Sequence, residues 1–142
     1  MPGRSDFQYT ILRVVPRVER GECINVGVVL FSRQLRFLGA RIKLDRRRLE
    51  ALYPGTDPAA IQPHLDAIQS VVDGDPTGGP VARLEPSERF GWVAAISSTV
   101  IQPSEVHTGL TDDPAATLRH LFDSLVTVDE VPAPGPHRNR AT

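Results

Sequence analysis

The chain has 142 residues, of which 40% are hydrophobic and 23% are charged, and its net charge of −1 is typical of a globular domain. The single cysteine, Cys23, excludes an internal disulfide and a cysteine-based zinc site, and no run of about 18 apolar residues is available to span a membrane. The stretch MPGRSDFQYT lacks the apolar core of a secretory signal, so we expect a cytoplasmic protein.

Three strands are predicted in the first third of the chain. Residues 7–15 and 35–44 alternate between apolar and polar positions, whereas 24–32 form a near-continuous apolar run, typical of a strand buried on both faces. The segment Ser32-Arg33-Gln34 is short enough for a hairpin turn, and residues 16–23 permit a second antiparallel return. Three consecutive antiparallel strands are therefore expected.

Four helices follow, over residues 45–55, 57–74, 86–97 and 113–126. Asp45 and Asp113 are expected to cap the first and the last of them. Pro63 predicts either a kink in the second helix or a start near residue 62. Short strands are expected at 98–102 and in SEVHTGL (104–110). The buried face of the last helix is predicted to consist of Leu118, Leu121, Phe122 and Leu125.

This order predicts an α+β fold, with a mostly antiparallel sheet of three to five strands and helices packed on one face. Residues 1–128 should form the single domain. Residues 129–142 are rich in proline and polar residues and should be a disordered tail. Cys23, beside the apolar strand, is expected to be a small buried thiol.

The charge is divided unevenly along the chain. Residues 1–48 hold eleven Arg or Lys and four Asp or Glu, whereas 49–142 hold five and thirteen. One interpretation is an anion-binding N-terminal half, since arginine forms bidentate bonds to phosphate and carboxylate. The alternative is that the two halves neutralise each other in the folded chain.

A first polar cluster lies at the start of the apolar strand and contains Arg17, Arg20, Glu22 and Asn25. Gly21 permits a positive φ at the turn, and Gly27 permits the close approach of another backbone or of a ligand. These groups could hold a phosphate or a partner's backbone. Alternatively, this is a structural turn in which Arg20 and Glu22 pair with each other.

A second polar cluster precedes the last helix and contains Gln102, Ser104, His107 and Thr108. The N-terminus of a helix attracts anions, but Asp112 and Asp113 already occupy it and weaken an anion site. His107 could serve as a general base, or it could be tied to neighbouring main-chain groups. We expect the two clusters to meet, with Arg20 or Glu22 within about 15 Å of His107.

Sequence motifs of several enzyme classes are absent. The chain has no G-x-x-x-x-G-K-[ST] loop, no G-x-G-x-x-G, no G-x-S-x-G and no pair of histidines spaced i, i+4. We therefore expect no cofactor and no metal site.

Two stretches together, RGECINVGVVLF (20–31) and IQPSEVHTGLTDDP (101–114), resemble the signatures of the bacterial family DUF3037, and the resemblance covers about residues 7–127. The family has no assigned activity. Similar proteins are often encoded beside kinases of the toxin-kinase type, which implies a protein partner.

The preferred hypothesis is a non-enzymatic binding module that engages a protein partner, such as a toxin-type kinase, or an anionic ligand. Its binding residues would be Arg17, Arg20, Glu22, Asn25, Gln102, His107 and Thr108. The alternative is a small enzyme acting on nucleic acid or a phosphorylated substrate. Arg20, Arg89 and His107 would then stabilise the transition state, with Glu22 as a base. Direct nucleic-acid binding is a third possibility, weakened by the net acidity of the chain.

Overall fold

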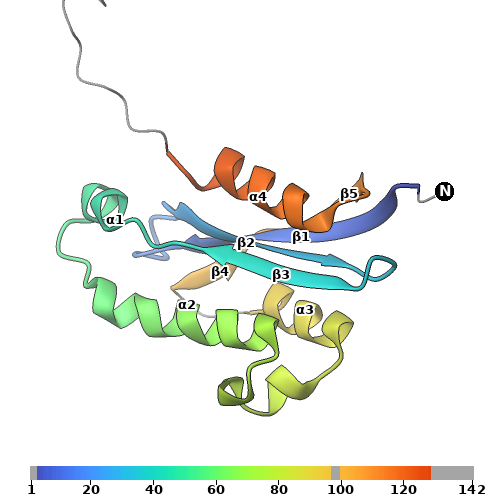
Figure 1. Cartoon of the computed structure of the whole chain (residues 1–142). Helices are drawn as coiled ribbons and strands as arrows, with labels where there is room; N and C mark the ends of the chain where they lie inside the picture. The colour runs from blue at the N-terminus through green and yellow to red at the C-terminus, as the bar shows by residue number, and fades with distance from the viewer. Residues whose placement is uncertain (1–2, 97–99, 129–142) are drawn as a thin grey trace, which may run out of the picture.

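A five-stranded antiparallel sheet forms the middle layer of the protein (Figure 1). The structure is a computed structural model that describes residues 3–96 and 100–128. The strands are β1 (Ser5–Val14), β2 (Ile24–Ser32), β3 (Phe37–Ile42), β4 (Ile101–Pro103) and β5 (His107–Thr111). The sheet order is β3-β2-β1-β4, and β5 pairs with the other half of β1. One edge is therefore β3, and the opposite edge is shared by β4 and β5.

The helices cover both faces of this sheet. They are α1 (Arg46–Leu52), α2 (Pro58–Asp73), α3 (Pro86–Ala94) and α4 (Pro114–Leu125), with short 3-10 turns η1 (Pro76–Gly78) and η2 (Pro80–Arg83). In Figure 1, α2 and α3 lie below the sheet and α4 lies above it. The α+β class and the mostly antiparallel sheet are confirmed. The expectation that the helices pack on one face is wrong, because α4 buries the second face of β2 and β3.

Two apolar clusters explain why β2 is buried along its whole length. Ile24 and Val26 pack toward α2 and α3, whereas Val28 and Leu30 pack toward Leu118 of α4. The change of face follows from a β-bulge: Leu12 pairs with Gly27 but Arg13 pairs with Asn25, so Val26 is an extra residue in β2. The bulge turns Asn25 toward α4.

The local signals in the sequence correspond to observed helix ends and turns. Asp45, Asp57 and Asp113 each accept hydrogen bonds from backbone N–H groups in the first turn of α1, α2 and α4. The hairpins β1–β2 and β2–β3 are both antiparallel, as predicted. Pro63 lies inside α2, which begins at Pro58, so a start near residue 62 is wrong.

Other expectations need correction or fall outside the described residues. Cys23 is exposed, because the chain enters the sheet only at Ile24. On α4, Leu118 is buried, whereas the other three predicted core residues are only partly buried. The predicted tail 129–142 and residues 97–99 lie outside the described residues. No helix in the described part of the chain is long and apolar enough to cross a bilayer.

Candidate functional site

The first polar cluster is a turn held together by its own side chains. Gly21 has a φ of +72°, the left-handed conformation that favours glycine. Arg20 donates from Nε to Glu22 Oε1 at 2.7 Å, and Arg17 donates to Glu19 at 2.9 Å and to the Tyr53 hydroxyl at 2.5 Å. The hydrogen bond from Arg20 lowers the pKa of Glu22. The turn therefore has the structural arrangement that the sequence left as an alternative.

Asn25 has a partner in the fold as well. Its side-chain amide donates to the Leu125 carbonyl at 3.0 Å, and Arg48 donates to the neighbouring Val126 carbonyl at 3.0 Å. The last carbonyls of a helix have no intrahelical partner, and a cation there also complements the helix dipole. Asn25 and Arg48 thus anchor the C-terminal end of α4, and part of the N-terminal positive charge is used within the molecule.

Arg89, a candidate in the enzyme hypothesis, performs the same task for α2. Its guanidinium donates to the carbonyls of Val71 at 3.1 Å, Val72 at 2.7 Å and Leu84 at 3.0 Å. It therefore joins the end of α2 to the start of α3. Arg20, Arg89 and His107 lie in three separate parts of the structure, and no common reaction centre is formed by them.

Ser104, in the second cluster, divides the outer strand into β4 and β5. Its N–H donates to the Ile11 carbonyl at 2.7 Å, and its hydroxyl oxygen accepts from the Ile11 N–H at 2.8 Å. Thr10, which is fully buried, donates to the Ser104 carbonyl at 2.8 Å. These hydrogen bonds fix the point from which β5 begins. Ser104 therefore has a structural role in the second cluster.

The remaining residues of the second cluster point to different faces. His107 pairs with Tyr9 across the sheet, and their rings stack with centroids 5.1 Å apart. Thr108 pairs with Gln8, and strand alternation places it on the opposite face. Gln102 pairs with Arg13 at the other end of β1. These three candidates therefore do not converge on one ligand.

The two clusters approach each other at one end of β1, where Arg13 pairs with Asn25 on one side and with Gln102 on the other, but the expectation that His107 lies near Arg20 or Glu22 is wrong. Tyr9, opposite His107, is five residues from Val14, about 17 Å along a strand at roughly 3.3–3.4 Å per residue. The loop that holds Arg17 and Arg20 begins beyond Val14 and contacts Tyr53, next to α1. In Figure 1, α1 and β5 lie at opposite ends of the sheet.

The outer edge of β5 is open in the described part of the chain. β5 pairs only with β1 there. Leu110 is 59% exposed and Val106, just before the strand, is 40% exposed. Gly109 leaves room for the Phe7 ring, since a Cβ at Gly109 would lie 2.6 Å from that ring. A strand without Lys, Arg, Asp or Glu thus borders the solvent, with Leu110 exposed on it and Val106 exposed just before it.

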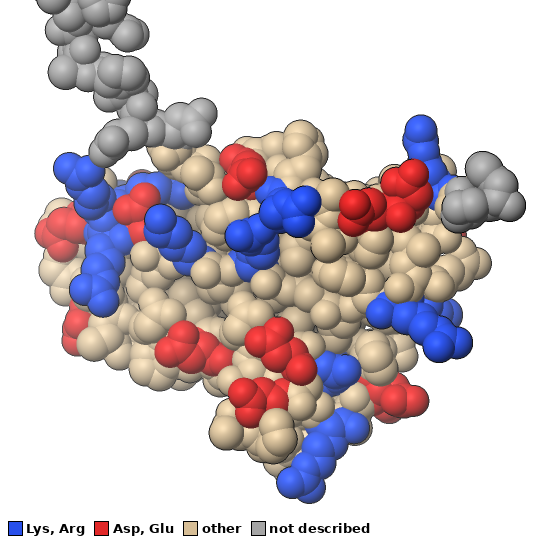
Figure 2. Space-filling view, viewed as in Figure 1, with Lys and Arg blue, Asp and Glu red and all other residues tan. Residues whose placement is uncertain are grey.

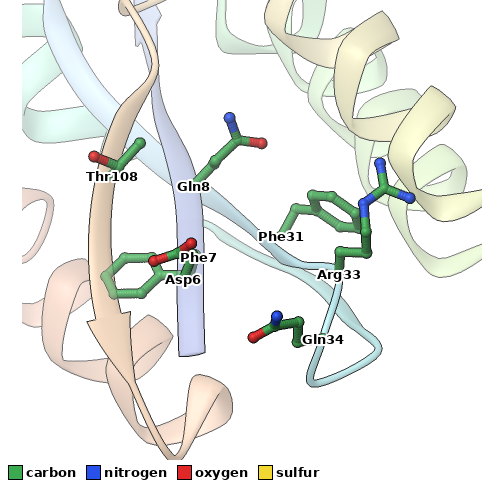
Figure 3. Close-up of a pocket in the computed structure, with 7 residues that line it drawn as sticks. All are labelled: Asp6, Phe7, Gln8, Phe31, Arg33, Gln34 and Thr108. Carbon is green, nitrogen blue, oxygen red and sulfur yellow. The ribbon is translucent and has the colours of Figure 1, made fainter. Parts of the chain in front are cut away.

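A hollow of about 450 Å³ lies beside β5 on the face that carries α2 and α3 (Figure 3). Its lining comes from the start of β1, the end of β2, the β2–β3 turn and β5. The lining residues are Asp6, Phe7, Gln8, Phe31, Arg33, Gln34 and Thr108. Of these, only Thr108 was a candidate from the sequence. The other signal was Ser32-Arg33-Gln34, which the sequence marked only as a turn.

Charges of both signs occur together on the face shown in Figure 2. Blue side chains gather over α1 and between α4 and α2, and red ones lie over the α2 layer and near the N-terminal end of the chain. The acidic and basic halves of the sequence are interleaved there, as the neutralising alternative expects. In residues 3–96 and 100–128, no three His, Cys, Asp or Glu side chains are grouped to hold a metal ion.

Comparison with known families shows a match to the family described as "Protein of unknown function (DUF3037)" over residues 9–126. The match spans most of the chain, so the chain belongs to this family. No curated protein and no solved structure matches it.

Proposed function

We propose that this DUF3037 family member is a non-enzymatic binding module that engages a protein partner, and that the partner adds an extended strand to the β5 edge. The observation that carries the proposal is the open edge of His107–Thr111 together with the exposed side chains of Val106 and Leu110. Main-chain hydrogen bonds to such an edge provide affinity, and alternate side chains provide specificity.

The sequence of β5 contains none of the usual protections of an edge strand. Natural edges are blunted by charged residues, proline, bulges or a covering element. The stretch VHTGLT (106–111) has no Lys, Arg, Asp, Glu or Pro. β4, on the same edge, is three residues long and ends in Pro103, which has no N–H to donate. The open part of this edge is therefore β5 rather than β4.

Charge at the ends of β5 favours a partner segment with basic flanks. Glu105 precedes the strand and Asp112 and Asp113 follow it, and all three are exposed. A second copy pairing antiparallel about Gly109 would place Glu105 opposite the second copy's Asp113 at both ends, which is unfavourable. A different protein with an apolar extended segment between basic residues fits better, and a toxin-type kinase is the partner class to test first.

The other ligand classes have less support. The arginines of the first cluster are engaged with Glu19, Glu22 and Tyr53, so an anionic ligand would have to displace those bonds. The candidate groups for catalysis lie apart from one another. Neither hypothesis accounts for the open strand.

The proposal is tested by capturing partners from the native cell with three forms of the chain: wild type, Leu110→Lys and Leu84→Lys. Leu84 is 41% exposed and lies between η2 and α3, away from β5, so it matches the chemical change without touching the edge. A protein captured by the wild type is then purified, and its affinity for each form is measured by calorimetry.

We expect Leu110→Lys to weaken binding by more than about tenfold, because lysine is a common guard of natural edges and would repel a basic partner. Leu84→Lys should bind as the wild type does. Equal binding by all three forms would reject the β5 edge as the contact surface. Loss of binding in Leu84→Lys alone would move the contact surface to the α2 and α3 side.

A further inference from the structure

The hollow beside β5 gathers polar side chains that have no partners among the described residues. In residues 3–96 and 100–128, the side chains of Asp6, Gln8, Gln34 and Thr108 make no hydrogen bond or ion pair, and Arg33 makes only a ring contact. All five are exposed at its rim, and the buried ring of Phe31 lies beneath them, whereas the Phe7 ring packs in the apolar cluster on the α4 face. An apolar floor with several convergent polar groups is the usual composition of a small-molecule site.

Arg33 is held in place by a column of aromatic rings. Its guanidinium lies 5.9 Å from the centroid of Phe31, and Phe31 stacks on Phe90 of α3 with centroids 5.7 Å apart. Figure 3 shows Arg33 and Gln8 on the two sides of the Phe31 ring. A guanidinium that stacks on an aromatic ring keeps the N–H donors around its rim free for hydrogen bonds. Arg33 can therefore donate to a carboxylate without first losing a hydrogen bond within the described part of the chain.

Asp6 provides the opposite charge in the same hollow. It lies on β1 and forms no ion pair with Arg33. In Figure 3, Asp6 lies on the side of Thr108, across the hollow from Arg33. A simple anion would meet the repulsion of Asp6, and a simple cation would meet that of Arg33. A ligand with separated charges of both signs can satisfy both groups at once.

We propose that this hollow binds a small zwitterion of the α-amino acid class. Its carboxylate accepts from Arg33 and Gln8, its ammonium group donates to Asp6 and Thr108, and its side chain lies over Phe31. The volume of about 450 Å³ lies within the usual 300–1,000 Å³ range of ligand pockets. Of the lining residues only Thr108 belongs to β5, and its side chain projects from the face of the sheet, so this site is separate from the outer main-chain groups of the proposed strand-binding edge.

The test is a binding screen of the common free amino acids at millimolar concentration, followed by amide chemical shifts in the wild-type chain. For the amino acid that binds best, two truncated probes are compared with it: the amine without the carboxylate, and the acid without the amino group. We expect the zwitterion to bind more than about tenfold tighter than either probe, since each lost charge-assisted bond removes that much affinity or more.

Three variants locate the site. Arg33→Gln and Asp6→Asn should each weaken zwitterion binding by about tenfold or more, and Arg33→Gln should leave the affinity for the amine probe unchanged. Arg36→Gln is the matched control, because Arg36 is exposed in the same turn and does not line the hollow. Tightest binding by the acid probe, failure of every amino acid to shift the hollow's resonances, or equal losses in Arg36→Gln would overturn the proposal. The capture experiment with Leu110→Lys is independent of each of these results.

Discussion

The two edges of the sheet are protected to different degrees. β3 carries Arg41, which lies over the ring of Phe122, and Lys43 follows the strand directly; β3 lies between α2 on one face and α4 on the other. β5 carries no charged residue, and the helices make their main contacts with β2 and β3 rather than with it. Unpaired edges promote association unless they are guarded. The contrast indicates which edge of this molecule is available to a partner.

The largest expected difference between the two edges is in stability. Leu118 of α4 is 5% exposed and packs beside Gly39 of β3, whereas Leu110 on β5 is 59% exposed. Leu118→Ala should lower the free energy of unfolding by about 2–5 kcal/mol, as truncations of buried leucines do. Leu110→Ala should change it by less than about 0.5 kcal/mol. Urea denaturation of both variants checks this, and similar midpoints would refute the difference in packing.

A second expectation concerns how β5 is seated against β1. Gly109→Val should destabilise the protein by about 1–3 kcal/mol, because its side chain would enter the space of the Phe7 ring, 2.6 Å from a Cβ at that position. Thr108→Val, on the exposed neighbouring position, should be close to neutral. Thermal unfolding of the pair measures this, and a neutral Gly109→Val would mean that Phe7 does not pack there.

The positive charges at the β3 edge, Arg41 and Lys43, can be removed to test whether they prevent self-association. Replacing Arg41 and Lys43 together by threonine should cost about 0.5–1 kcal/mol, the usual value of an exposed contact between a cation and a ring. It should also make the protein self-associate with rising concentration, since the edge loses its charges. Sedimentation velocity of the double variant gives the answer. A double variant that stays monomeric would show that the helices alone protect β3.

The smallest effect is expected in the first polar cluster. Arg20→Gln should leave the denaturation midpoint unchanged, because the Arg20–Glu22 pair is exposed on both sides. The pKa of Glu22 is lowered in the fold, so the pair's small contribution is present above the ordinary glutamate pKa and is lost as pH falls through the lowered value. Unfolding in neutral and in acidic buffer should therefore differ little between Arg20→Gln and the wild type.

Local features of the fold were predictable because their causes lie within a few residues. Asp45 and Asp113 cap helices through bonds to the next turn, and Gly21 turns the chain by its own φ. The run 24–32 predicted a strand buried on both faces, and such a strand requires cover on both sides. This requirement conflicts with the prediction that the helices pack on one face of the sheet. In the structure helices cover both faces, as the burial of residues 24–32 requires.

The features that were not predicted depend on contacts distant in sequence. Asn25 bonds to a carbonyl at residue 125, and Arg89 to carbonyls at 71 and 72, so neither role is visible in a local pattern. The hollow likewise combines Asp6 and Gln8 with Arg33 and Thr108. Polar clusters near strand ends were expected to share one rim, but the first lies beyond the end of β1 and His107 lies opposite its middle.

The central claim, that a partner adds a strand to β5, is tested most directly by hydrogen–deuterium exchange on the purified complex. Amides that point outward from an edge strand exchange readily until a new strand bonds to them. We predict that partner binding slows exchange in His107–Thr111, with little change in β3 and in the 16–23 loop. Protection confined to the loop or to β3, with β5 unchanged, would contradict the proposal.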